Sequence, residues 1–141
     1  MLHCAVRALA RFGRDQSGAS EAVEFALVGP LLIAFLFSIY EVGQALWTQG
    51  VLDFAVEQAA RCASVNAGTC GTANAITGYA AGLTSPLNLN KSVFTATTPA
   101  CGNQVTASYQ FNFVSIGILP IINTRLFPTS VVLTSSSCYP K

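Results

Sequence analysis

The chain has 141 residues, which is enough for one modest domain with accessory segments but not for two full catalytic domains. Hydrophobic residues make up 52% of it and charged residues only 9%, whereas charged residues are about a quarter of a soluble globular protein. The formal net charge is +1, and only four basic side chains follow Gly18, so the main part of the chain lacks the basic patch that a nucleic-acid-binding protein needs.

The first 18 residues form a basic leader. Three arginines lie within the first 14 residues, and the leader ends in the polar sequence DQSG (residues 15–18), which favours a flexible, accessible link. Acidic residues follow the apolar stretch that comes next. Because basic segments stay on the cytoplasmic side of a membrane, this distribution predicts a cytoplasmic N-terminus and a periplasmic or extracellular C-terminal part.

The apolar stretch from Phe25 to Tyr40 holds 16 residues without a charge, and it lengthens to 19 when residues 22–24 are included. A membrane-spanning helix needs about 20 mostly apolar residues, with a range of roughly 17–25. We therefore expect a helix that crosses the inner (cell) membrane once, with a local kink at Pro30. The alternative is a cleavable secretory signal, whose apolar core has about 7–15 residues and precedes a small-residue cleavage site.

After Tyr40 the apolar residues recur at i, i+3 and i+4 spacing, which indicates an amphipathic helix. We expect one continuous helix over residues 20–63 that crosses the bilayer and continues outside it as a spine. At 1.5 Å per residue such a helix is roughly 65 Å long, about twice the thickness of the hydrocarbon core.

The remainder of the chain predicts a small α+β domain. A loop at residues 66–71 precedes a short second helix over residues 72–81, with Thr72 as its N-cap and Gly82 at its end. Residues rich in Val, Thr, Tyr and Phe then indicate a small three-stranded antiparallel sheet. Its strands are expected at residues 92–98, 104–113 and 130–138, with an apolar loop at residues 116–123 between the last two.

Cysteine usage agrees with export. Four of the five cysteines follow the apolar stretch, and in an oxidising compartment they can pair completely in three ways. We favour Cys62–Cys70, which closes a short loop, together with Cys101–Cys138, which ties the chain end to the domain. A zinc site would need Cys-x2-Cys spacing or histidines, and residues 58–141 contain neither.

No catalytic constellation can be assembled from the exported part. Residues 58–141 contain no Asp, Glu or His, and therefore no general base of the usual kinds and no hard metal ligand. The glycine-containing pieces match neither a Walker nor a Rossmann fingerprint. We expect a protein that is not an enzyme, with no catalytic residues, no metal and no cofactor.

The junction between leader and apolar stretch carries the most specific pattern in the sequence. A basic leader is followed by Gly18, Ala19 and Ser20, and then by AVEFALVGPLL (residues 22–32). IYEVG (residues 39–43) and the alanines and arginine of residues 55–61 complete the pattern. Over residues 11–65 this combination resembles the TadE-like pseudopilins of tight-adherence pilus systems, which are minor subunits of the type IV pilin kind.

The resemblance implies cleavage of the leader by a prepilin peptidase on the cytoplasmic side. Cleavage after Gly18 would place Glu24 at the sixth mature position, and cleavage after Ala19 would place it at the expected fifth, so both bonds stay open. Phe25 marks Glu24, and not Glu21, as the motif residue. A carboxylate within a bilayer needs a partner, and a new α-amino group on a neighbouring helix is a suitable one. The alternative is that Glu24 only reaches the headgroup layer.

We expect three parts: a cleaved leader (residues 1–19), a transmembrane and spine helix (residues 20–65) and an exported domain (residues 66–141). The resulting hypothesis is a minor pseudopilin that takes part in pilus assembly or initiation. Its expected partners are prepilin peptidase, other pilin-like subunits, pilus assembly proteins and the lipid bilayer, with no nucleic acid. The alternatives are an unprocessed single-pass scaffold of a secretion machine and a secreted adhesin or binding module.

Overall fold

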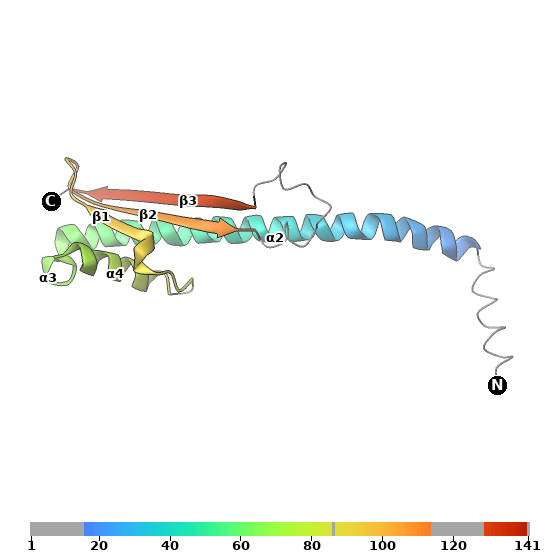
Figure 1. The fold of residues 1–141 in the computed structure, drawn as a ribbon, viewed down its shortest axis with the longest axis horizontal. Helices are drawn as coiled ribbons and strands as arrows, with labels where there is room; N and C mark the ends of the chain where they lie inside the picture. Colours follow the sequence, from blue (N-terminus) through green and yellow to red (C-terminus); the bar gives the residue numbers. More distant parts are fainter. Residues whose placement is uncertain (1–15, 86, 114–128, 141) are drawn as a thin grey trace, which may run out of the picture. The chain divides into compact units, whose positions relative to one another are not determined.

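The computed structural model describes residues 16–85, 87–113 and 129–140. The chain divides into two units, Met1–Ile39 and Tyr40–Lys141, and the division falls inside one helix. The elements in chain order are α2 (Gln16–Val65), α3 (Ala67–Cys70), α4 (Ala73–Leu83), a 3-10 turn η1 (Lys91–Val93), β1 (Phe94–Thr97), β2 (Asn103–Asn112) and β3 (Ser130–Tyr139) (Figure 1). The α+β fold predicted from the sequence is confirmed.

Helix α2 is continuous over 50 residues and contains Pro30. It begins at Gln16, four residues before the expected start at Ser20, and it ends at Val65, two residues after the expected end. The earlier start has a simple cause, since residues 16–19 contain no proline and a helix that has nucleated extends at little cost. The polar end of the leader, expected as a flexible link, is therefore helical.

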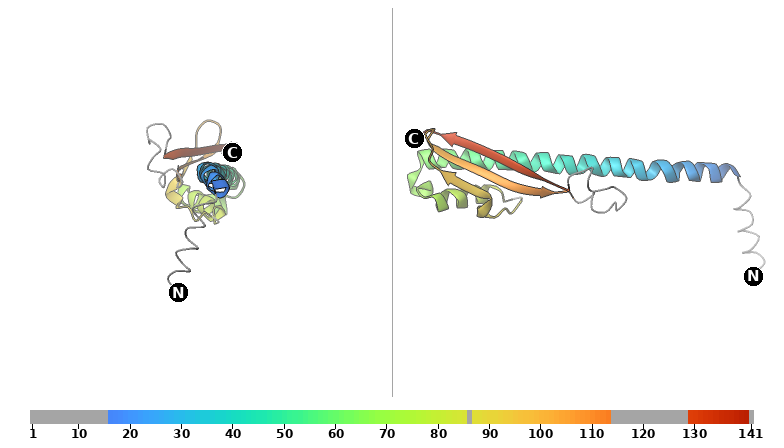
Figure 2. Two further views of the ribbon diagram at one scale, coloured as in Figure 1. Left: turned by 90° about the vertical axis from the view of Figure 1, so that its right-hand side faces the viewer. Right: turned by 45° about the horizontal axis from the view of Figure 1, so that its top comes forward.

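In the unit Tyr40–Lys141, one face of α2 is buried in the core. Five residues at i, i+3, i+4, i+7 and i+8 spacing line this face: Leu52, Ala55, Val56, Ala59 and Ala60. They form one hydrophobic cluster with Ala80 of α4, Phe94 of β1 and two β2 residues, Val105 and Ala107. Three of the five α2 residues are alanine, and small side chains allow close approach of the backbones. The core is thus one helix face packed against a sheet and a short helix (Figures 1 and 2).

Two capped helices follow α2. The Asn66 side chain accepts a hydrogen bond from the Thr69 amide and so starts α3 inside the segment that was expected to be a loop. Thr72 caps α4 as predicted, because its hydroxyl accepts from the amide of Ala75 at 3.2 Å. Helix α4 continues past Gly82 to Leu83, since the C-terminal cap is Thr84, whose amide and hydroxyl both donate to the Ala81 carbonyl.

The sheet is antiparallel with strand order β1-β2-β3. Odd-numbered β2 residues such as Val105 and Ala107 face the core, while even-numbered residues such as Ser108 and Gln110 face outward. The register places Val105 opposite Ser137, so odd-numbered β3 residues share the inner face. The three strands lie close to their predicted positions, except that β1 has only four residues because a 3-10 turn replaces its start. The expected loop at residues 116–123 lies outside the described residues.

We expect Leu52→Ala to lower the free energy of unfolding by about 2–5 kcal/mol, because Leu52 is completely buried and its truncation leaves a cavity. Leu46→Ala is the matched control on the same helix. Leu46 is 68% exposed, so its truncation should change stability by no more than about 0.5 kcal/mol. Denaturant unfolding of both variants in detergent measures the difference, and equal losses would contradict the packing described above.

Candidate functional site

The first half of α2 presents apolar side chains that nothing in the described chain covers. Large hydrophobic residues from Val23 to Tyr40 are more than half exposed. The span Glu21–Val65 is the one helix among the described residues that is long and apolar enough to cross a membrane. A water-facing helix does not normally expose such a continuous apolar surface, so this segment is a candidate membrane span.

The exposed apolar segment has the length of a bilayer core. Residues 22–40 cover about 28 Å along a helix, compared with about 30 Å for the hydrocarbon thickness. Glu24 lies near the start of this segment and is exposed. Glu41, directly after it, is buried, at 9% exposure. In the sequence, Glu41 is one of the acids that follow the apolar stretch and belongs to the IYEVG pattern, and neither observation predicted that it is buried.

The residues predicted to form the processing site lie close together in sequence, all on α2. Gly18, Ala19 and Ser20 fall in its first turns, and Glu24 and Phe25 follow less than two turns later. Phe25 is 78% exposed and Glu24 is also exposed, so both side chains are accessible to another molecule. Cleavage of the leader, and the bond at which it occurs, both stay predictions.

A second exposed surface lies on α2 within the unit Tyr40–Lys141, opposite the buried face. We call it the outward face. It begins with Gly43, Leu46, Trp47, Gly50 and Phe54, and ends with Glu57 and Arg61. The three large residues are more than half exposed, and a Cβ added to either glycine would meet no atom within 4 Å. The outward face is therefore apolar and exposed, and its two glycines would let another helix come close to the α2 backbone. One acidic and one basic residue lie at its end.

The four cysteines that follow the apolar stretch form two disulfides. Cys62 at the end of α2 pairs with Cys70 of α3, and Cys101 between β1 and β2 pairs with Cys138 of β3. These are the pairs that the spacing favours. The first joins residues 8 positions apart in the sequence, and the second joins residues 37 positions apart. The second bond therefore fixes the C-terminal strand to the turn before β2.

We expect removal of the longer disulfide to destabilise the domain more than removal of the shorter one. Loop-closure entropy gives about 4 kcal/mol for Cys101–Cys138 and about 2.5 kcal/mol for Cys62–Cys70. The double variants C101S/C138S and C62S/C70S can be compared by thermal unfolding in detergent. A larger loss of thermal stability in C62S/C70S would show that local strain or packing, and not loop length, determines how much each disulfide stabilises the domain.

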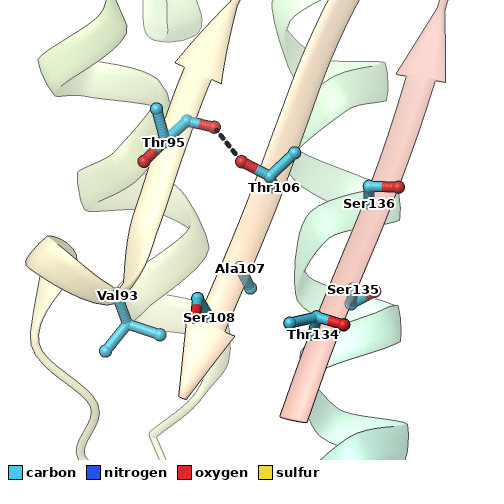
Figure 3. A pocket seen from close by; sticks show the side chains of 8 residues that line it. All are labelled: Val93, Thr95, Thr106, Ala107, Ser108, Thr134, Ser135 and Ser136. Carbon is cyan, nitrogen blue, oxygen red and sulfur yellow. Dashed lines mark hydrogen bonds between the residues drawn. The ribbon is translucent and has the colours of Figure 1, made fainter. Parts of the chain in front are cut away.

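The outer face of the sheet carries a shallow hollow of about 300 Å³ (Figure 3). Hydroxyl side chains from all three strands line it: Thr95, Thr106, Ser108, Thr134 and Ser136. Thr95, Thr106 and Ser136 lie opposite one another in the register, and the Thr106 hydroxyl donates to the Thr95 carbonyl. This row was missed from the sequence, because it appears only when the strands are aligned.

This hollow lacks the groups that acid–base catalysis requires. None of its lining residues is Asp, Glu, His, Lys or Arg, and Ser or Thr without an adjacent base is a weak nucleophile. A second hollow of about 470 Å³ near the end of α2 is likewise uncharged, with Ser64, Thr97, Thr98 and Asn103 as its polar side chains. In the described ranges, no group of three or more His, Cys, Asp or Glu side chains could hold a metal ion.

By length and composition, α2 is a candidate membrane span, which is consistent with a single-pass membrane protein, and it continues into a small α+β unit. Residues 19–61 match the model of the TadE-like protein family, which confirms the resemblance inferred from the sequence. The matched segment starts at the predicted processing site and ends at Arg61, so it lies wholly within α2. No curated protein and no solved structure matches the chain.

Proposed function

We propose that this chain is a minor pilin-like subunit of a tight-adherence pilus or related secretion system, processed by a prepilin peptidase and taking part in pilus assembly or initiation. The observation that carries the proposal is the coincidence of two features on α2. The TadE-like match covers residues 19–61, and the same helix exposes its apolar side chains in the isolated chain. A helix that is membrane-compatible and exposes a long apolar segment suits a subunit that moves from a bilayer into a helical assembly.

The outward face of α2 supports packing against a neighbouring helix in the assembled state. Gly43 and Gly50 allow backbones to approach closely, and Leu46, Trp47 and Phe54 supply apolar area around them. The buried face of the same helix is already occupied by the sheet and α4. A neighbouring pilin-like helix would therefore use the outward face without disturbing the core.

In this proposal Glu24 is an assembly residue. The leader is removed after Gly18 or Ala19, and the new α-amino group of one subunit pairs with the Glu24 carboxylate of another. Within a bilayer or a helix bundle an unpaired carboxylate is unfavourable. This ion pair would therefore favour one alignment of the neighbouring subunits' helices along each other. The N-terminus before cleavage is then cytoplasmic and the unit with the sheet is periplasmic or extracellular. The role is structural, with no cofactor.

The first test is intact-mass and N-terminal analysis of the membrane-extracted protein, with and without a co-expressed prepilin peptidase. We expect the peptidase to shorten the chain to one that begins at Ala19 or Ser20. A leader that stays attached beside an active peptidase would overturn the proposal in favour of an unprocessed membrane scaffold. A mature chain that begins near Tyr40 would instead indicate a secreted adhesin or binding module.

The second test separates Glu24 from the neighbouring carboxylate. We expect Glu24→Gln to lower incorporation of the processed subunit into pili by about tenfold or more, equivalent to about 1.4 kcal/mol, because the neutral amide cannot pair with an ammonium group. Glu21→Gln is the matched control, since Glu21 is another exposed carboxylate on the same helix.

Quantitative blotting of sheared pili against the membrane fraction measures incorporation in both variants. An equal loss in the two variants, or no loss in Glu24→Gln, would contradict the assigned role of Glu24.

A further inference from the structure

The exposed residues along the outward face of α2 follow a strict seven-residue pattern. Aromatic residues occupy positions 40, 47 and 54, glycines occupy positions 43 and 50 between them, and two charged residues continue the same alternation of three and four positions. All of these residues are exposed. We call the set the seam, and its members are Tyr40, Gly43, Trp47, Gly50, Phe54, Glu57 and Arg61. A heptad spacing of this kind is typical of a helix that packs lengthwise against another helix.

The seam lies on the side of α2 opposite the core. At about 100° per residue, its mean direction is about 180° from that of the five core residues of α2 between Leu52 and Ala60. The sheet and α4 pack against those core residues. Neither of them therefore covers the seam, which stays exposed over three heptads.

The far end of the seam is too distant from the apolar segment to be covered by lipid. Phe54 is 51% exposed and lies 14 positions after Tyr40, which is about 21 Å further along the helix. The headgroup layer adds only about 5–8 Å to each side of the hydrocarbon core. With residues 22–40 in the bilayer, as proposed above, Phe54 would face water. Exposed aromatic residues in a row are a feature of interaction surfaces.

We propose that the seam pairs with the seam of a second copy of this chain, as a parallel two-stranded coiled coil in register. The inference rests on the packing role proposed above for the outward face, and it names the partner. Parallel helices suit two copies that cross one membrane in the same sense. The two-fold axis runs along the helices, so the two sheets lie on the outer sides of the pair.

The sizes of the seam residues are complementary to the seam itself. In a parallel coiled coil, each side chain of the seam enters a hole formed by four residues of the facing helix. For Trp47, Gly43 and Gly50 of the second copy lie at the two ends of that hole. A Cβ added to either glycine would meet no atom within 4 Å, so the space in front of both is open. The indole ring can therefore occupy the space that the absent side chains leave, and Phe54 enters beside Gly50 in the same way.

The two charged residues favour a second copy as the partner and fix the register. In register, Arg61 of each copy lies beside Glu57 of the other, which gives two ion pairs related by the two-fold axis. A shift of one heptad would remove at least one pair, because Arg61 of one copy would then lie beyond Val65, where α2 of the other copy ends. The partner must combine small residues opposite Trp47 with opposite charges at this spacing, and α2 itself does so.

A charge-swap experiment on the full chain in detergent tests the register. We expect the dimer measured by light scattering to weaken by about tenfold or more in Glu57→Arg alone and in Arg61→Glu alone, because four like charges then meet at the end of the seam. A mixture of the two variants should regain an affinity within about threefold of the unmodified chain. The double variant E57R/R61E should do the same, and it is the matched control because it carries the same two residues in exchanged positions.

Cysteine cross-linking in membranes provides the second measurement, in a Cys4→Ser background that removes the one cysteine outside the two disulfides. We expect Gly50→Cys to form a disulfide-linked dimer on mild oxidation. With helix axes about 8–10 Å apart, facing Cα atoms at the seam lie about 4–6 Å apart, which overlaps the disulfide range. Val42→Cys is the control, because Val42 is 54% exposed but points about 100° away from the seam.

Three outcomes would overturn the inference: a monomer at all concentrations, equal cross-linking at the two positions, or charge variants that behave alike alone and mixed. A Gly50→Cys variant that cross-links only to a different pilin-like subunit would assign the seam to that subunit and would also overturn it.

The intact mass of the same samples separates this inference from the proposed function. A cleaved leader without a dimer would overturn the inference alone. A dimer whose leader stays attached beside an active prepilin peptidase would support the inference and overturn the proposed function.

Discussion

The packing of one alanine-rich face of α2 under the sheet is the contact on which the unit Tyr40–Lys141 depends. A sheet of three strands needs a second layer to bury its inner face, and α2 with α4 supplies that layer. The core side chains of α2 are small, and Ala55, Ala59 and Ala60 let the strands lie close to the helix axis. Because one face of α2 is buried under the sheet, the opposite face is the one that remains exposed.

The scarcity of charge after Arg61 limits the kinds of contact that this part of the chain can make. Among the described residues after Arg61, Lys91 is the one charged side chain, and its ammonium group donates to Asn74 at 3.4 Å. Long-range electrostatic steering is therefore weak, and association depends on apolar area and backbone hydrogen bonds at short range. Such contacts change little with ionic strength, because few charges are available to be screened.

Much of the fold could be predicted from the sequence, because the signals are local. The apolar stretch and the i, i+3, i+4 spacing after it predict α2, and the alternation around Tyr109 predicts β2. Thr72 has the residue type and position expected of a helix N-cap, and the structure confirms that it caps α4. Helix α3 was missed because four residues capped by Asn66 have no periodicity to detect.

The parts that could not be predicted depend on residues far apart in the chain. The Gln49–Thr134 hydrogen bond joins residues separated by 85 positions, and no local pattern marks either partner. The hydroxyl row on the outer face requires the register of three strands. For the processing site the sequence pattern is more informative than the fold, since an α-helix through Gly18 and Ala19 presents neighbouring peptide bonds in equivalent geometry.

The disulfide Cys101–Cys138 links the stability of the sheet to the compartment in which the chain resides. In a reducing environment both sulfur atoms would remain thiols, and the C-terminal strand would be held by its hydrogen bonds to β2, by the side chains of Gln49 and Ser64, and by packing of its inner face on the core. Reduction of this bond would therefore lower the stability of the sheet, so the redox state around the chain bears on how stable this unit is. A copy whose cysteines stay reduced would then be less stable, and more readily degraded, than an oxidised copy.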